Sequence, residues 1–181
     1  WLRRRLIPVI SEIIATEKLG TNRVRALMPK LNMFGESKQL GHYYRSSPDG
    51  ERILLGGRRM HKQENFAKQR LHNGLTEIFP ELKDTKIDAY WRGFVAFPFD
   101  QLPKLAVHKG IIYPSGFCGS GTVWARWLGQ KAAFMVLGEA AESAFKNLPM
   151  MTLPLYSGDP WFLPLAMSYY RLRDRFSVST K

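Results

Sequence analysis

The pattern of hydrophobic and polar positions in the first half of the chain predicts strands joined by a tight turn. Residues 6–16 are apolar and rich in β-branched side chains, and they predict a strand that the chain enters through Pro8. Residues 42–45 and 52–57 flank a Pro-Asp-Gly turn at 48–50, where proline presets φ and glycine accepts a positive φ. These two segments are therefore expected to form a β-hairpin.

A helix and a longer strand are predicted after this hairpin. From 62 to 78 the apolar positions recur with helical spacing, and Pro80 ends the pattern. Residues 86–97 predict a strand that stops at a proline. Residues 20–40 are interrupted by glycine and proline, so we expect a loop there.

The second half of the chain predicts another hairpin and then a strand, a turn and a helix in succession. Residues 105–107 and 111–113 are short apolar segments separated by a turn that contains glycine. A glycine-rich turn at 116–122 then leads into a long helix predicted over 123–145. A segment rich in proline and glycine follows, and a last helix is predicted over 165–175.

The composition is that of a globular protein and excludes several kinds of site. With 45% hydrophobic and 23% charged residues among 181, the chain lacks the low hydrophobicity of disordered segments. The single cysteine excludes an intramolecular disulfide and a cysteine-based zinc site, and it is typical of a reducing compartment. The four histidines are far apart in the sequence, so no metal site is expected. We predict a soluble, cytoplasmic protein.

The chain is strongly basic, with 27 Lys+Arg against 15 Asp+Glu and a formal net charge of +12. Such a charge is compatible with peripheral contact with acidic surfaces, with nucleic acid, or with solvated termini. Half of the excess lies at the two ends, in residues 3–5 and 171–181. No nucleic-acid binding is expected, because the aromatic residues fall at core-like positions without interleaved basic residues.

The glycine-rich turn at 116–122 carries the most informative chemical signal. Glycines let backbone amides approach a ligand, and the N-terminus of the following helix carries partial positive charge. The turn is a candidate cradle for an anion or oxyanion, and the alternative is that its glycines serve tight packing. The glycines at 116, 119 and 121 lack the G-x-G-x-x-G spacing of a dinucleotide-binding fingerprint, which occurs nowhere in the sequence.

Six short motifs occur in an order that is typical of one family. They are Tyr43-Tyr44-Arg45-x-Ser47-Pro48-Asp49-Gly50, Ile53-Leu54-Leu55-Gly56-Gly57-Arg58, Phe79-Pro80, Trp91-x-Gly93, Asp100-x-x-Pro103 and Gly116-Phe117-x-Gly119-x-Gly121. Between Leu6 and Leu148 the chain resembles the C-terminal part of the FAD-dependent amine and amino-acid oxidoreductases, such as glycine oxidase, sarcosine oxidase and D-amino-acid dehydrogenase.

The resemblance implies an α+β fold in three segments. Residues 1–93 would form a substrate-binding domain on a mixed sheet, 94–148 the C-terminal strand, loop and helix of an FAD-binding α/β domain, and 149–181 a C-terminal extension. The N-terminal Rossmann part of the FAD domain is missing from this sequence, so an N-terminal half or a partner chain is expected to supply it. The complete enzyme would oxidise the C–N bond of an amine or amino acid to an imine by hydride transfer to flavin.

The resemblance assigns the glycine-rich turn to the flavin. The implied cofactor-binding residues are Gly116, Phe117, Cys118, Gly119, Ser120, Gly121 and Thr122. The helix N-terminus after the turn would face the pyrimidine end of the isoalloxazine ring and stabilise negative charge there. Some sarcosine oxidase relatives attach flavin to a cysteine near the position of Gly93, which is not cysteine here, so FAD is expected to be non-covalent. Cys118 is expected to be a small loop residue rather than a covalent or redox group.

The resemblance also implies a substrate-binding set of Tyr43, Tyr44, Arg45 and Trp91. Successive side chains of a strand alternate between faces, so only one of the two tyrosines is expected to line the pocket. Glycine oxidase relatives clamp a substrate carboxylate with an arginine near residues 94–99, where this chain has none, and an amine substrate is therefore favoured. No catalytic acid or base is recognisable in the sequence.

A second hypothesis assigns no catalysis to the chain. The same fold could serve as a basic structural or interaction subunit, which would explain the charge of +12 without a flavin. Binding of FAD distinguishes the two hypotheses.

Overall fold

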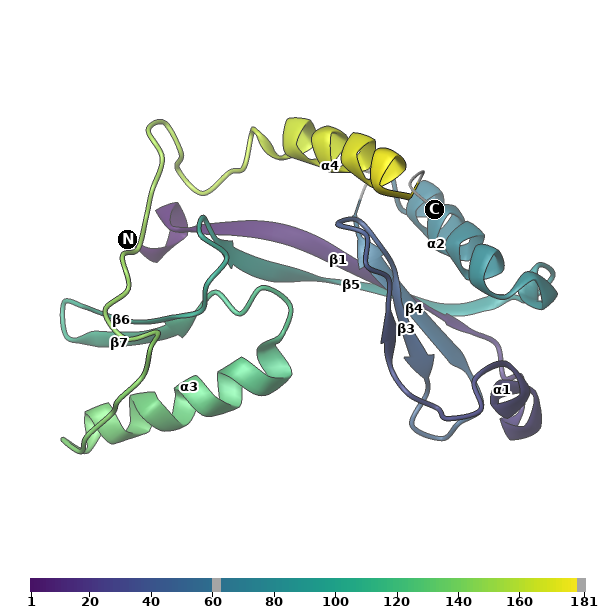
Figure 1. Cartoon of the computed structure of the whole chain (residues 1–181), viewed down its shortest axis with the longest axis horizontal. Coiled ribbons are helices and arrows are strands. Elements are labelled where there is room, and N and C mark those ends of the chain that lie inside the picture. Colours follow the sequence, from purple (N-terminus) through teal and green to yellow (C-terminus); the bar gives the residue numbers. More distant parts are fainter. Residues whose placement is uncertain (60–62, 179–181) are drawn as a thin grey trace. The chain divides into compact units, whose positions relative to one another are not determined.

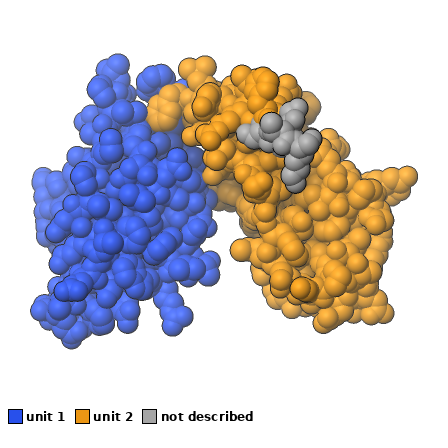
Figure 2. Space-filling view, in the orientation of Figure 1, with its two compact units in different colours: residues 1–9, 94–161 blue, residues 10–93, 162–181 orange. Residues whose placement is uncertain are grey.

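A computed structural model describes residues 1–59 and 63–178. The chain divides into two compact units (Figure 2). Unit 1 contains Trp1–Val9 and Phe94–Trp161, and unit 2 contains Ile10–Gly93 and Phe162–Lys181. The chain changes unit after Val9, Gly93 and Trp161, whereas the division implied by the resemblance is 1–93, 94–148 and 149–181; the assignment of those segments to domains stays a prediction.

A five-stranded sheet organises unit 2, with the strand order β2-β3-β4-β1-β5 (Figure 1). The strands are β1 (Leu6–Thr16), β2 (Phe34–Gly35), β3 (Tyr43–Ser46), β4 (Ile53–Arg58) and β5 (Ile87–Pro98). The pairs β2–β3, β3–β4 and β1–β4 are antiparallel, and Leu55 is the register partner of both Tyr44 and Ile14. The predicted hairpin is confirmed, and Gly50 has the positive φ of +72° that its turn requires.

Helices cover one face of this sheet. They are α1 (Thr21–Leu27), α2 (Glu64–Ile78) and the 3₁₀ turn η2 (Pro80–Leu82). Their buried side chains meet those of β1 and β4 in one core, which consists of Ile14, Val24, Met28, Ile53, Leu55, Leu71, Leu75, Phe79 and Leu82. The opposite face, called here the open sheet face, carries the alternate side chains of the same strands, among them Ser11, Ile13, Tyr43, Arg45 and Leu54.

Unit 1 is built on a hairpin and a helix. The hairpin consists of β6 (Lys104–His108) and β7 (Ile111–Ser115), and the helix α3 (Gly121–Val136) contacts β7. Tyr156 closes this unit: it is only 1% exposed, its hydroxyl donates to the Leu6 carbonyl at 2.6 Å, and its ring meets Phe99 edge-on at 5.4 Å. A short 3₁₀ turn, η1 (Leu2–Arg4), precedes β1.

The last helix, α4 (Leu163–Val178), belongs to unit 2. Both carboxylate oxygens of Asp174 accept backbone hydrogen bonds, from the amides of Gln39 and Leu40 at 2.9 Å each. The side chain of Asp174 therefore faces the loop before β3. None of the helices in the described ranges has the length and apolar character needed to span a bilayer.

The predicted α+β class is confirmed, with two corrections to its elements and one to its sheet. The expected loop at 20–40 contains the two-residue strand β2 and α1, a seven-residue helix whose apolar contacts, Val24 and Met28, are too few for a visible period. The helix predicted over 123–145 ends at Val136, and Gly138, with φ of +74°, follows it. The strand pairs whose register is given above are antiparallel, where a mixed sheet was predicted.

Candidate functional site

The loop between β7 and α3 contains two glycines that are required for different reasons. Gly116 has φ of +72°, and a Cβ there would lie 2.3 Å from Cγ of Pro98, so this glycine is required by close packing. Gly119 has φ of +97°, but a Cβ there would meet no atom within 4 Å. The packing explanation therefore holds for Gly116 and fails for Gly119, where the backbone borders open space.

A pocket of about 380 Å³ opens beside this loop. It lies within unit 1 and is lined by Leu6, Phe94, Val95, Ala96, Pro114, Ser115, Gly116, Phe117, Cys118, Gly119 and Gly121. Its volume falls in the range of small-molecule sites. The lining is mainly apolar, with the polar backbone of the glycine loop at one side.

The N-terminus of α3 adds hydrogen-bond donors to this pocket. The amides of Gly121 and Thr122 have no acceptor within the helix, because the first four amides of any α-helix lack one. Ser120 occupies the N-cap position, and within the described part of the chain its side chain makes no capping hydrogen bond. The helix end is thus able to donate to an acceptor in the pocket and carries partial positive charge.

The structure gathers most of the predicted cofactor residues at this pocket. Gly116, Phe117, Cys118, Gly119 and Gly121 line it, whereas Ser120 and Thr122 do not. The Cys118 thiol donates to the carbonyls of Gly116 at 3.3 Å and Gln101 at 3.4 Å. This thiol therefore ties two loop segments together.

Asp100 organises the turn after β5. It accepts a hydrogen bond from the Leu102 amide at 3.1 Å and forms an ion pair with Lys104, which is only 1% exposed. Desolvation opposes its ionisation, but the Lys104 ammonium and the Leu102 amide outweigh that cost, and the pKa of Asp100 is lowered. Asp100 therefore stabilises the turn between β5 and β6.

The two tyrosines of the predicted substrate set lie on opposite faces of the sheet in unit 2. The Tyr43 ring covers Gly56 on the neighbouring strand, where a Cβ would lie 2.3 Å from the Tyr43 Cζ atom. Its hydroxyl lies 2.7 Å from Oγ of Ser11. Tyr44 packs instead against the core, stacked on Phe34 at 5.3 Å and edge-on to Phe79 at 5.5 Å.

Arg45 and Trp91 share the open sheet face with Tyr43. Arg45 is exposed and lies two residues from Tyr43 on β3, so both point to the same side. Trp91 is 42% exposed and follows Tyr90, whose ring approaches the Lys68 ammonium of α2 at 5.2 Å. Because Tyr90 faces the helices, Trp91 faces away from them.

A buried polar network on the helix side of the sheet was not predicted from the sequence. Glu12 is 0% exposed; its Oε1 accepts a hydrogen bond from Tyr90 at 2.7 Å and lies 3.3 Å from Nε of Arg59. Burial and the Glu12 hydrogen bond and charge raise the pKa of Tyr90 to about 12. The only available signal was a glutamate inside an apolar strand.

His42 is enclosed between a strand and a helix. A Cβ at Gly74 would lie 2.5 Å from its ring and would force the ring to move, whereas one at Gly57 would make a tight contact at 3.3 Å. Nδ1 of His42 is 3.2 Å from Oε2 of Glu36, which also accepts the His42 amide at 2.7 Å. Burial lowers the pKa of His42 despite the nearby carboxylate.

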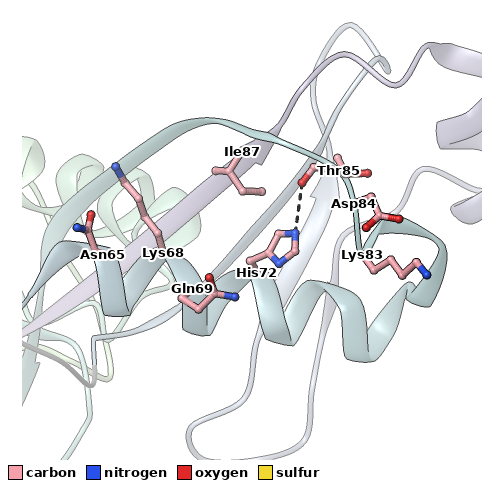
Figure 3. Close-up of a pocket in the computed structure, with 8 residues that line it drawn as sticks. All are labelled: Asn65, Lys68, Gln69, His72, Lys83, Asp84, Thr85 and Ile87. Atoms are coloured by element: carbon pink, nitrogen blue, oxygen red, sulfur yellow. Dashed lines mark hydrogen bonds between the residues drawn. The ribbon is translucent and has the colours of Figure 1, made fainter.

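A second pocket, of about 370 Å³, lies between α2 and the start of β5 (Figure 3). Nε2 of His72 donates to the Thr85 carbonyl at 3.2 Å, and Lys68 pairs with Glu64 at 2.8 Å (Figure 3 shows the first contact). The His72 ring and the Lys68 ammonium are thus engaged with neighbouring residues. Across residues 1–59 and 63–178 no group of three or more His, Cys, Asp or Glu side chains is arranged to hold a metal ion.

Comparison with solved structures identifies the class to which the fold corresponds. Glycine oxidase from Geobacillus kaustophilus matches with a TM-score of 0.62 and 18% identity, over 82% of this chain and 39% of that one. L-proline dehydrogenase from P. horikoshii matches with a TM-score of 0.59 and 18% identity, over 90% of this chain and 41% of that one. The chain therefore has the fold of part of an amine or amino-acid oxidoreductase.

Curated sequences identify the relatives more closely. Gamma-glutamylputrescine oxidoreductase from Escherichia coli (strain K12) is 30% identical in an alignment of 184 positions that covers 98% of this chain and 42% of the relative. The probable oxidoreductase OrdL from Rhizobium meliloti (strain 1021) is 31% identical in an alignment of 178 positions that covers 94% of this chain and 40% of that relative. The chain is a homologue of these oxidoreductases, which confirms the resemblance found in its motifs. It spans about two-fifths of their length, and no protein-family model matches it.

Proposed function

We propose that this chain forms part of an FAD-dependent oxidoreductase that oxidises the C–N bond of an amine or amino acid to an imine, with FAD bound non-covalently. The homology to gamma-glutamylputrescine oxidoreductase and OrdL supports oxidoreductase chemistry. The observation that carries the cofactor assignment is the pocket where the N-terminus of α3 meets the glycine loop.

The residues around this pocket fit a flavin ring. An isoalloxazine is flat and largely apolar, and its pyrimidine edge carries hydrogen-bond acceptors. The apolar side chains of Phe94, Val95 and Phe117 suit the ring faces, and the amide of Gly121 suits the acceptors. When bound, FAD would accept the hydride from the carbon that carries the amine.

The chain's own residues would then position and stabilise the cofactor. The partial positive charge at the N-terminus of α3 favours an electron-rich ring edge at that place. Gly119 leaves room for a ligand to approach the loop backbone, because no atom lies within 4 Å of the position that a Cβ would occupy there. The Cys118 thiol donates to two backbone carbonyls, so it contributes to the loop geometry and is not needed as an attachment point.

The open sheet face of unit 2 is the proposed contact for the substrate. Tyr43, Arg45 and Trp91 present aromatic surface and a guanidinium there. Tyr44 is assigned a supporting role, because its ring packs against Phe34 and Phe79 in the core. Since residues 94–99 contain no arginine to clamp a carboxylate, an amine is proposed in preference to an α-amino acid.

The test is a titration of the purified chain with FAD, followed by flavin absorption and fluorescence. We expect saturable binding with shifted visible bands, and bleaching of those bands when an oxidisable amine is added without oxygen. Gly119→Val places a side chain in the open space of the pocket, at a positive φ, and should weaken FAD binding about tenfold or more.

Gly110→Val is the matched control. Gly110 also has a positive φ, of +76°, with no atom within 4 Å of a Cβ, but it lies in the β6–β7 turn and does not line the pocket. This variant should bind FAD as the parent chain does. A chain that leaves the FAD spectrum unchanged would contradict the proposal and favour the non-catalytic subunit. Equal weakening in both variants would assign the effect to backbone strain.

A further inference from the structure

Four large apolar side chains form an exposed stripe along α4 (Figure 1 shows this helix in yellow). They are Leu165, Tyr169, Leu172 and Phe176, which are 73%, 60%, 54% and 70% exposed. Their spacing of four, three and four residues places them on one side of a helix that turns by about 100° per residue. We call these four residues the α4 stripe.

The orientation of α4 is determined by the opposite side of the helix. Asp174 lies nearly opposite the stripe at about 100° per residue, and its carboxylate holds the amides of Gln39 and Leu40 at 2.9 Å each. Ala166, Met167 and Tyr170, on that same side, are half-buried. The side of α4 that carries Asp174 is thus attached to unit 2, and the stripe faces outward.

Basic residues flank the stripe on both sides. Arg173 and Arg175 are exposed and lie roughly 70–90° from its centre on opposite sides of the helix. Asp174 is the only acidic residue between 163 and 178, and it is engaged with the loop before β3. Among residues 163–176, the outward side of α4 therefore carries large apolar side chains with arginines beside them and no carboxylate of the helix itself.

This combination of apolar and basic side chains is typical of a helix that binds a membrane surface. An interfacial helix lies in a bilayer surface with leucine and aromatic residues on the buried side and arginine or lysine at its edges, next to anionic headgroups. A second copy of the chain is disfavoured, because pairing two stripes would bring Arg173 and Arg175 of one copy close to those of the other. We propose that the α4 stripe, with Arg173 and Arg175, is a docking surface for anionic phospholipid membranes.

The test is co-sedimentation of the full 181-residue chain with lipid vesicles. One set contains phosphatidylcholine alone, and the other contains equal parts of phosphatidylcholine and phosphatidylserine. The chain should bind the anionic vesicles at least about tenfold more tightly, and added salt should weaken that binding. Arg173→Gln with Arg175→Gln should reduce it by roughly fivefold for each arginine.

Matched variants separate the stripe from general charge and hydrophobicity. Arg25→Gln with Lys30→Gln removes the same charge from exposed positions elsewhere in unit 2 and should change binding far less. Leu172→Ser with Phe176→Ser should abolish most of the binding. Val136→Ser with Leu137→Ser, at positions 76% and 69% exposed around the end of α3, should leave it intact. Circular dichroism verifies that each variant is folded.

Three outcomes would overturn the proposal. The first is no binding to either kind of vesicle, and the second is equal losses for the α4 variants and their controls. The third is a dimer that Leu172→Ser with Phe176→Ser dissociates while vesicles are ignored, which would assign the stripe to a second copy. If the serine pair unfolds, the arginine pair and its control still decide the question, because all four positions are exposed.

Discussion

The helices α2 and α3 both follow a strand, yet they use their apolar residues differently. In α2 one complete face is buried, with Ala67, Leu71, Gly74 and Leu75 in contact with the sheet or core. Within residues 121–136, all of which are described, α3 buries Leu128 alone, although its sequence is the more apolar. Apolar composition therefore does not by itself identify the helix that holds a core together.

The glycines of the two helices differ in the same way. A Cβ at Gly74 would lie 2.5 Å from the His42 ring, whereas one at Gly129 in α3 would have no atom within 4 Å. Side chains pack closely against the buried face of α2, and this packing stabilises the fold. The α3 surface is less filled, and its N-terminus borders the pocket that we propose for FAD.

The largest effect that would test this comparison is expected from a core truncation. Leu71→Ala removes a fully buried side chain of α2 and should lower the free energy of unfolding by about 2–5 kcal/mol. Val136→Ala in α3, at a position 76% exposed, should change it by no more than about 0.5 kcal/mol. Urea denaturation followed by circular dichroism measures both. Similar losses for the two variants would contradict the distinction between the helices.

A pair of glycine substitutions should change stability in opposite directions. Gly74→Ala forces the His42 ring to move and should cost about 1–3 kcal/mol. Gly129→Ala meets no neighbour and gains helix propensity, so it should stabilise the chain by about 0.5–1 kcal/mol. Thermal unfolding of the two variants beside the parent chain gives the signs. A stabilising Gly74→Ala would show that the imidazole does not depend on this glycine.

The smallest expected effect is the pH dependence that comes from His42. Burial and Arg70 lower its pKa, while Glu36 and Glu77 oppose that shift. Since the folded pKa lies below the ordinary value of 6.5, the unfolded chain binds the proton more readily. The His42 contribution to stability is therefore complete above about pH 6.5 and is lost as the pH falls through the folded pKa.

Denaturation at several pH values between about 7 and 5 measures this contribution. His42→Gln should flatten the decline in unfolding free energy over that range. His72→Gln, which removes the half-buried ring that bonds to Thr85, is the control and should leave the decline in place. An unchanged decline in His42→Gln would assign it to other groups.

Much of the fold was predictable from local sequence. The strand 6–16 was predicted with the bounds it has, because β-branched residues recur along its whole length. The hairpin at 42–57 followed from its Pro-Asp-Gly turn, and α2 from its period and Pro80. Seven-residue α1 and the end of α3 at Val136 were missed, because short helices and helix ends depend on packing and on single residues such as Gly138.

The candidate cofactor loop was predictable for a different reason. The glycines at 116, 119 and 121 lie between a predicted strand and a predicted helix. This arrangement is typical of a loop that binds an anion. The sequence left open whether these glycines serve packing or a ligand. The structure distinguishes them: Gly116 is crowded by Pro98, and Gly119 faces open space.

The sequence by itself determined the element types, the α+β class and the relationship to amine and amino-acid oxidoreductases, because these depend on local periodicity and ordered motifs. Only the tertiary structure decided that Tyr44 belongs to the core while Tyr43 faces outward, and that Glu12 is buried with Tyr90. It also decided that the α4 stripe faces away from unit 2. The physical reason is that alternation and helical period define faces, whereas the neighbour of each face is set by contacts between residues far apart in the chain.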